Sequence, residues 1–146
     1  MTDARGPALA TAIVSDCKLA TWSMPCEFER VYVAREDLVD LDATLVQVVY
    51  AAQRTNPDSR SAWKHEYDID FAVRKKVTVD DLPTLDNLSI LLDEIVDYWK
   101  THKPTGTSCV LSAAEWPMPF VPDHLTTLKQ FTGVIRLTFR LVRTNS

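Results

Sequence analysis

The chain has 146 residues, of which 46% are hydrophobic and 25% are charged. This length and composition predict a single α+β domain over residues 1–146, with one hydrophobic core. The formal net charge of −4 argues against a protein that captures nucleic acid through bulk positive charge.

The first half of the chain predicts one helix and two strands. Apolar residues at helical spacing predict a helix over Pro7–Lys18. β-branched and aromatic residues predict strands over Phe28–Val33 and Leu45–Ala51, and Asp37–Asp42 predicts a turn or a single helical turn between them, with the aspartates as local caps. Gln53–Ser61 contains an Asn-Pro-Asp turn signal, so we expect a polar loop that a partner can order.

The second half predicts two long strands that flank a helix. Alternation over Trp63–Val77 predicts a strand, and the apolar spacing of Leu85–Trp99 predicts a helix. A short strand over Ser108–Trp116 follows, and the prolines of Trp116–Pro122 predict a non-helical linker. Strict alternation over Lys129–Arg143 predicts a final strand with one buried face. The predicted fold is therefore an antiparallel or mixed sheet of four to five strands with two helices packed on one face.

The residue pattern does not favour catalysis. The glycines do not form a P-loop or a dinucleotide-binding loop, and the three cysteines give no C-x-x-C pair, so we expect free thiols. His65 lies on the apolar face of its strand, which predicts a half-buried histidine with a hydrogen-bond partner. Asp68 and Asp70 share the other face, which we interpret as solvated. We expect no enzyme, no metal and no cofactor. The alternative is a small cytosolic metal- or nucleotide-dependent enzyme in which these three residues converge.

Charge is distributed unevenly along the chain. Asp80–Asp97 holds six acidic residues and no base, whereas Lys129–Arg143 holds four basic residues and no acid. This asymmetry either suits subunits that bring unlike faces together or reflects a solvated helix beside a basic strand. Aromatic residues do not interleave with the arginines, so the pattern does not favour a single-strand nucleic-acid binder.

The segment Trp116–Pro122 predicts a surface for partners. Its Trp, Met and Phe residues alternate with prolines, as in an intersubunit arm or in a loop folded back over the domain's own core. We expect no membrane-spanning segment and no signal peptide, because the apolar runs are short and the N-terminus lacks the signal pattern. The candidate interface residues are Arg54, Arg60, Trp116, Met118, Phe120, Arg136, Arg140 and Arg143.

Four segments stand out by their order along about the C-terminal half of the chain. They are the strand Tyr67-Asp-Ile-Asp-Phe-Ala-Val-Arg-Lys-Lys-Val77, the helix Leu85–Trp99, the linker Pro119-Phe-Val-Pro-Asp-His-Leu125 and the strand Gln130-Phe-Thr-Gly-Val-Ile-Arg-Leu-Thr-Phe-Arg140. Together they resemble the tail terminator (tail-completion, minor tail protein) family of siphophages, the long-tailed bacteriophages.

The resemblance implies a structural virion protein without an active site. Such a protein forms a hexameric ring that caps the tail tube, stops its polymerisation and joins the tail to the head-completion or stopper protein of the neck. Genomic DNA passes through the lumen of the ring without sequence-specific contacts. The resemblance also implies assembly in the bacterial host cytoplasm and a final location in the virion tail or neck. Another head–tail connector or stopper of the neck is the alternative within the same assembly.

Overall fold

The computed structural model describes residues 5–33 and 43–144, and of residues 143 and 144 only the backbone. The predicted turn at Asp37–Asp42 lies outside the described residues. The elements in chain order are α1 (Arg5–Leu19), β1 (Cys26–Val31), β2 (Thr44–Ser59), β3 (Ala62–Lys76), α2 (Leu82–Thr101), β4 (Val110–Met118), the short π-helix η1 (His124–Leu128) and β5 (Gln130–Thr144).

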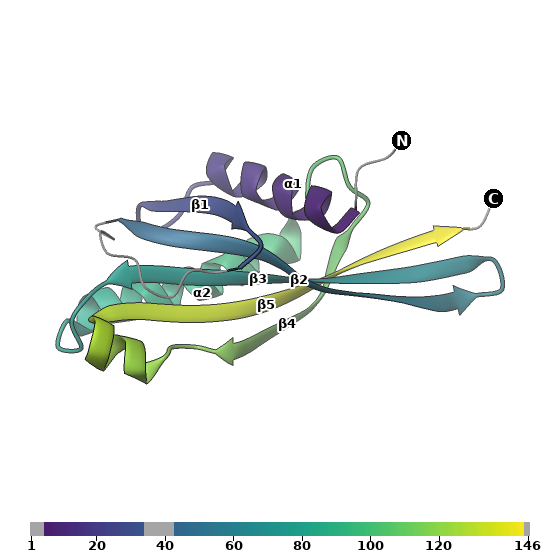
Figure 1. Cartoon of the computed structure of the whole chain (residues 1–146). Coiled ribbons are helices and arrows are strands. Elements are labelled where there is room, and N and C mark those ends of the chain that lie inside the picture. Colours follow the sequence, from purple (N-terminus) through teal and green to yellow (C-terminus); the bar gives the residue numbers. More distant parts are fainter. Residues whose placement is uncertain (1–4, 34–42, 145–146) are drawn as a thin grey trace.

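The strands form one mixed sheet in the order β1-β2-β3-β5-β4. β1 pairs with β2 in parallel, and every other neighbouring pair is antiparallel. Both helices pack on the same face of this sheet, with α1 over β1 and β2 and α2 over β4 and β5 (Figure 1). The structure therefore confirms the predicted α+β fold with two helices on one face.

The core lies between the helices and the apolar face of the sheet. α2 buries one or two side chains in each turn along its inner face, from Leu88 to Trp99, as its apolar spacing predicts. The Trp99 ring meets Phe139 of β5 edge to face, with 5.8 Å between the ring centroids. The same face of the sheet contributes fully buried residues from its two central strands, which are Tyr67, Ile69, Phe71, Val73, Ile135 and Leu137.

β2 and β3 continue beyond the body as a projecting hairpin (Figure 1). β1 ends at Val31, opposite Val49, and β4 begins at Val110, opposite Arg140, so neither strand accompanies the hairpin. Only β5 does so, and it pairs with β3 as far as Thr144 opposite Ala62. We call this projection the arm and define it as residues 53–66 of the hairpin and 140–144 of β5.

The prediction of a polar loop at Gln53–Ser61 is wrong. β2 runs through this segment to Ser59 and pairs with β3 residue by residue, so the chain reverses only at Arg60 and Ser61. Pro57 is compatible with a strand here because β2 is the edge strand of the arm, where no neighbour needs its missing N–H. The pairing with β3 and β5 outweighs the local turn signal of Asn56-Pro57-Asp58.

Candidate assembly interface

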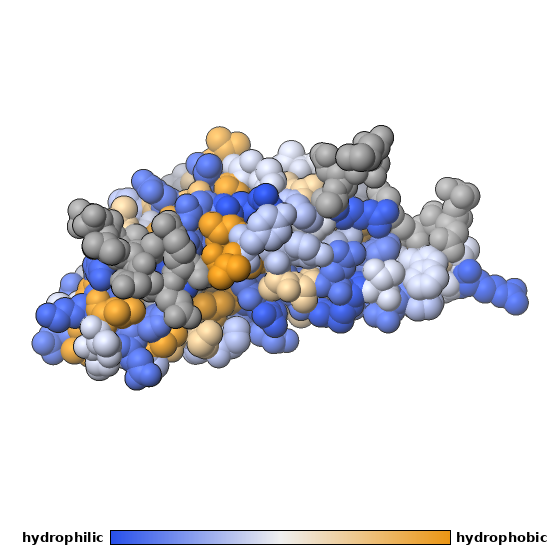
Figure 2. Space-filling view, in the orientation of Figure 1, coloured by the Kyte–Doolittle hydropathy of each residue, from blue (hydrophilic) through white to orange (hydrophobic). Residues whose placement is uncertain are grey.

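The arm has a hydrophilic surface. Every residue from Gln53 to Ser61 is exposed, and Trp63 near the tip is 40% exposed. In the space-filling view the arm is mainly blue and pale, whereas orange residues gather on the body (Figure 2). Strands that project from a body with both edges open are a typical means of contact with another chain.

His65 stands on the helix side of the arm. Its Nδ1 lies 3.0 Å from Thr55 Oγ1, and its Nε2 lies 3.3 Å from Arg5 Nη1. The residue is half-buried. This confirms the predicted half-buried histidine with hydrogen-bond partners.

At the base of the arm, Asp68 joins three strands on the sheet face that carries no helix. Arg54 donates two hydrogen bonds to its carboxylate, of 2.8 and 3.0 Å, and Thr138 Oγ1 donates a third of 2.8 Å. These bonds lower the pKa of Asp68, with the bonds from Arg54 as the largest cause, although burial acts in the opposite direction. Asp68 is only 5% exposed, so the interpretation of a solvated carboxylate is wrong for this residue.

Arg136 is held in the same way by Asp70. Its Nε and Nη2 donate to the two carboxylate oxygens at 2.8 and 3.0 Å, and this pairing raises the pKa of Arg136. Glu115 of β4 is its register partner on the other side. The outward face of β5 is therefore not a free cationic surface, because carboxylates of neighbouring strands neutralise its central arginine.

The predicted arginines thus divide into two groups. Arg54 and Arg136 are engaged by Asp68 and Asp70, whereas Arg60 and Arg140 are exposed and have no side-chain partner among residues 5–33 and 43–142. The backbone of Arg143 lies opposite Trp63, and its side chain lies outside the described part. Of these predicted arginines, the two that are exposed without a side-chain partner, Arg60 and Arg140, both belong to the arm.

The end of β4 and the linker after it expose their apolar side chains. β4 runs to Met118, so the first three residues of the predicted linker Trp116–Pro122 are part of this edge strand, and the linker itself begins at Pro119. Trp116, Met118 and Phe120 are 41%, 47% and 51% exposed. The backbone N–H of Val121 donates to the carbonyl of Thr132 at 2.9 Å, which fixes the end of the linker beside β5. The three side chains do not close over the domain's own core, and exposed apolar groups held by a fixed backbone are typical of interaction surfaces.

A polar belt crosses the helix-free face of the sheet and was not predicted. Gln47 donates to Glu29 at 2.9 Å, Arg74 donates to Gln47 at 3.1 Å and to Thr132 at 3.4 Å, and His124 lies 2.8 Å from Thr132. The belt connects β1, β2, β3, β5 and η1. Alternation in the sequence indicates which face each residue takes, but the belt depends on strand order.

The structure does not form the cluster that the enzyme alternative requires. Successive residues of a strand point to opposite faces, so His65 lies on the helix side while Asp68 and Asp70 lie on the other. Across residues 5–33 and 43–142, no group of three or more His, Cys, Asp or Glu side chains is placed to hold a metal ion.

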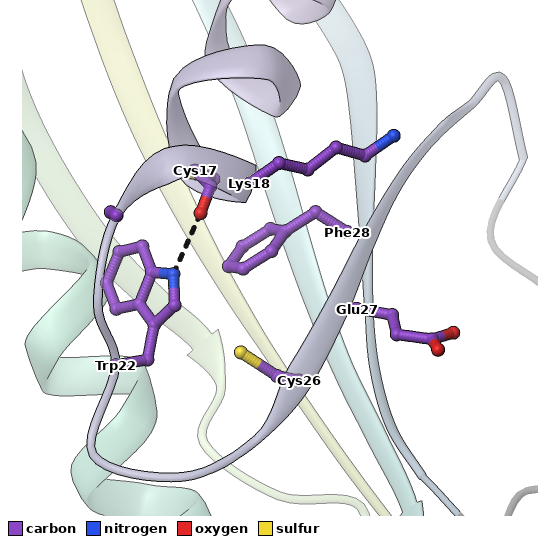
Figure 3. Close-up of a pocket in the computed structure, with 7 residues that line it drawn as sticks. Cys17, Lys18, Trp22, Cys26, Glu27 and Phe28 are labelled. Carbon is purple, nitrogen blue, oxygen red and sulfur yellow. Dashed lines mark hydrogen bonds between the residues drawn. The ribbon is translucent and has the colours of Figure 1, made fainter.

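A pocket of about 350 Å³ opens between the end of α1 and the start of β1 (Figure 3). The Trp22 indole donates to the carbonyl of Cys17 at 2.9 Å and stands 5.4 Å from the Phe28 ring. Burial raises the pKa of the Cys26 thiol to about 11, so at neutral pH it is a protonated thiol and a weak nucleophile. The lining residues are Cys17, Lys18, Ala20, Trp22, Cys26, Glu27 and Phe28.

Replacement of Asp68 tests the role of its ion pair. We expect Asp68→Asn to lower the free energy of unfolding by about 1 to 2 kcal/mol at pH 7, because Arg54 loses the charged carboxylate that accepts its hydrogen bonds. The loss is no larger because about half of the Arg54 side chain is exposed to water. Since the folded pKa of Asp68 is lowered, its contribution is present above the unfolded pKa near 4 and is lost as the pH falls through the folded value. Urea titrations at pH 7 and pH 3 should therefore show a smaller difference between wild type and variant at pH 3. An equal difference at both pH values would contradict this role.

Within the described residues, no helix combines the length and the apolar character needed to cross a bilayer. No protein-family model matches the chain, and no curated protein sequence matches it.

Proposed function

We propose that this chain is a structural protein of a long-tailed phage, a tail terminator whose copies form a hexameric ring on the end of the tail tube. The ring stops tube polymerisation and offers its opposite side to the head-completion protein of the neck, and DNA passes through its centre. The observation that carries the proposal is the arm, a well-paired part of the sheet that projects from the body and buries little of its own surface. Paired strands that stay exposed in a single subunit typically become buried against another chain.

The remaining surface supports a subunit that meets its neighbours through unlike faces. Rings that close by rotation use head-to-tail contacts, in which one patch of a subunit binds a different patch of the next. The arm lies at one end of the body, and β4 ends away from it (Figure 1). The exposed side chain of Trp116 lies near that end of β4, and exposed Phe120 follows it. The resemblance of Tyr67–Val77, Leu85–Trp99, Pro119–Leu125 and Gln130–Arg140 to tail terminators gives this assembly its place at the tube end.

Electron microscopy of the purified protein with tail tubes tests the proposal. We expect the protein, added to the tube protein encoded in the same genome, to form rings at tube ends and to halt their elongation. The control is the tube protein alone, whose tubes should continue to lengthen. A protein that stays monomeric and never binds tubes would overturn the proposal, and a ring that binds only the head-completion protein would assign it to another neck component.

A further inference from the structure

We propose that the tip of the arm binds the outer face of α2 on the next copy of this chain. This inference rests on the proposed function, because it takes the ring as the assembly and specifies the contact that closes it. Its two surfaces are Arg60 and Trp63 at the arm tip, and a stripe along α2 that contains Asp86, Ile90 and Asp93.

Among the described residues, the arm tip carries an unpaired cation next to an exposed aromatic ring. Arg60 lies in the turn and is exposed, and Trp63 follows it on β3. Lys64 points to the other face of the strand, where it pairs with Glu66 at 3.6 Å, so it is not part of this surface. Between Gln53 and His65 the single acidic residue is Asp58. Trp and Arg supply much of the binding energy in protein interfaces, because they combine a large contact area with polar contacts.

The outer face of α2 has the opposite charge around an exposed aliphatic side chain. Residues spaced by three or four along a helix lie in one stripe, and on the outer face of α2 this stripe is Leu82, Asp86, Ile90, Asp93 and Asp97. Leu82 and Ile90 are 64% and 50% exposed. Asp86 and Asp93 have no side-chain partner in the described part of the chain, and Asp97 accepts a hydrogen bond from Lys100 at 3.2 Å.

The two surfaces complement each other in charge and in apolar content. The carboxylates of Asp86 and Asp93 suit the guanidinium of Arg60, and Ile90 between them suits the exposed ring of Trp63. The arm points away from the body, so its tip cannot reach α2 of its own chain (Figure 1). The contact is therefore between copies, and it is head-to-tail, as a closed ring requires.

Side-chain recognition is also favoured over pairing of free strand edges. Pro57 lies on the outer strand of the arm, and Pro117 lies in β4, the edge strand on the other side of the sheet. Each proline removes a backbone donor, and both strands contain register shifts. These features hinder a continuous sheet between copies, so the tip must bind through its side chains.

To test the contact, the charge of each surface is reversed in a separate variant, and the two variants are then mixed. The arm variant is Arg60→Glu, and the helix variant is Asp86→Lys with Asp93→Lys. We expect each variant alone to need a protein concentration about tenfold higher than wild type for half-maximal ring assembly on tail tubes. An equimolar mixture should assemble as wild type does, because the two variants can alternate around a ring with an even number of subunits and every contact then joins opposite charges.

The control pair is Lys18→Glu and Glu27→Lys, which reverses exposed charges elsewhere and should assemble as wild type does. If wild type forms rings but the arm variant assembles normally, or the mixture fails to recover, the arm–helix contact is overturned while the proposed function stands. If wild type forms no rings even with tubes, both fail. If a charge-reversed variant unfolds, Arg60→Gln and Asp93→Asn are made instead, singly and as a double variant. Losses of ring assembly that are not additive in the double variant support the contact, and additive losses overturn it.

Discussion

Shortening the arm is expected to abolish ring assembly while the body stays folded. The variant replaces residues 55–65 with Asn-Gly, so that Arg54 and Glu66, which are opposite each other in the hairpin, are joined by a two-residue turn. Most of the removed side chains are exposed, and the hydrogen bonds between Arg54 and Asp68 are kept. We expect the melting temperature to change by no more than about 5 °C, because exposed residues contribute little to stability, and rings on tail tubes to disappear in electron micrographs.

The control keeps the length of the arm and changes only its polar side chains, with Asn56→Ser and Asp58→Ser. We expect this variant to assemble, because neither residue belongs to the cationic and aromatic tip. If the shortened chain formed rings at the wild-type concentration, the arm would not be needed for assembly. The observation that carries the proposed function would then no longer support it.

The regular elements of this fold are predictable from periodicity because one buried face imposes it. α2 and β3 each place their apolar residues on a single side, and the structure forms both within a few residues of the predicted bounds. The arm is different, since no buried face marks it. Its strands form because β3 pairs with β2 on one side and with β5 on the other, and pairing between segments so distant in sequence leaves no local signal at Gln53–Ser61.

The ion pairs of the arginines are likewise not predictable from the sequence of a single strand. Alternation correctly places Arg136 on the helix-free face, but the sequence of its own strand suggests an isolated cation. The strand order sets Asp70 opposite Arg136 and Glu66 opposite Arg140, and this order depends on the whole sheet. Only after the partners of Arg54 and Arg136 are known does the unpaired charge of Arg60 at the arm tip stand out.

Gly133 is the position where we expect a single substitution to cost most. A Cβ atom at this position would lie 2.7 Å from the carbonyl oxygen of Pro119, 2.8 Å from Leu92 Cδ1 and 3.0 Å from Phe131 Cε1. Leu92 can turn aside, but the Pro119 oxygen belongs to a backbone that the Val121–Thr132 hydrogen bond holds beside β5. Gly133→Val should therefore lower the free energy of unfolding by about 3 kcal/mol, measured by urea titration, because either the linker or the central strand must shift.

Gly106→Ala provides the matched comparison, since it separates crowding from backbone strain. Nothing lies within 4 Å of a Cβ at Gly106, but its φ of +78° is one that L residues rarely adopt. We expect this variant to lose about 1 kcal/mol through the backbone alone. If Gly133→Val lost no more than Gly106→Ala, the linker would have to yield freely. It could not then hold Phe120 as part of a fixed surface beside the end of β4. A loss near 3 kcal/mol would instead show that the sheet fixes the linker from which this side chain projects.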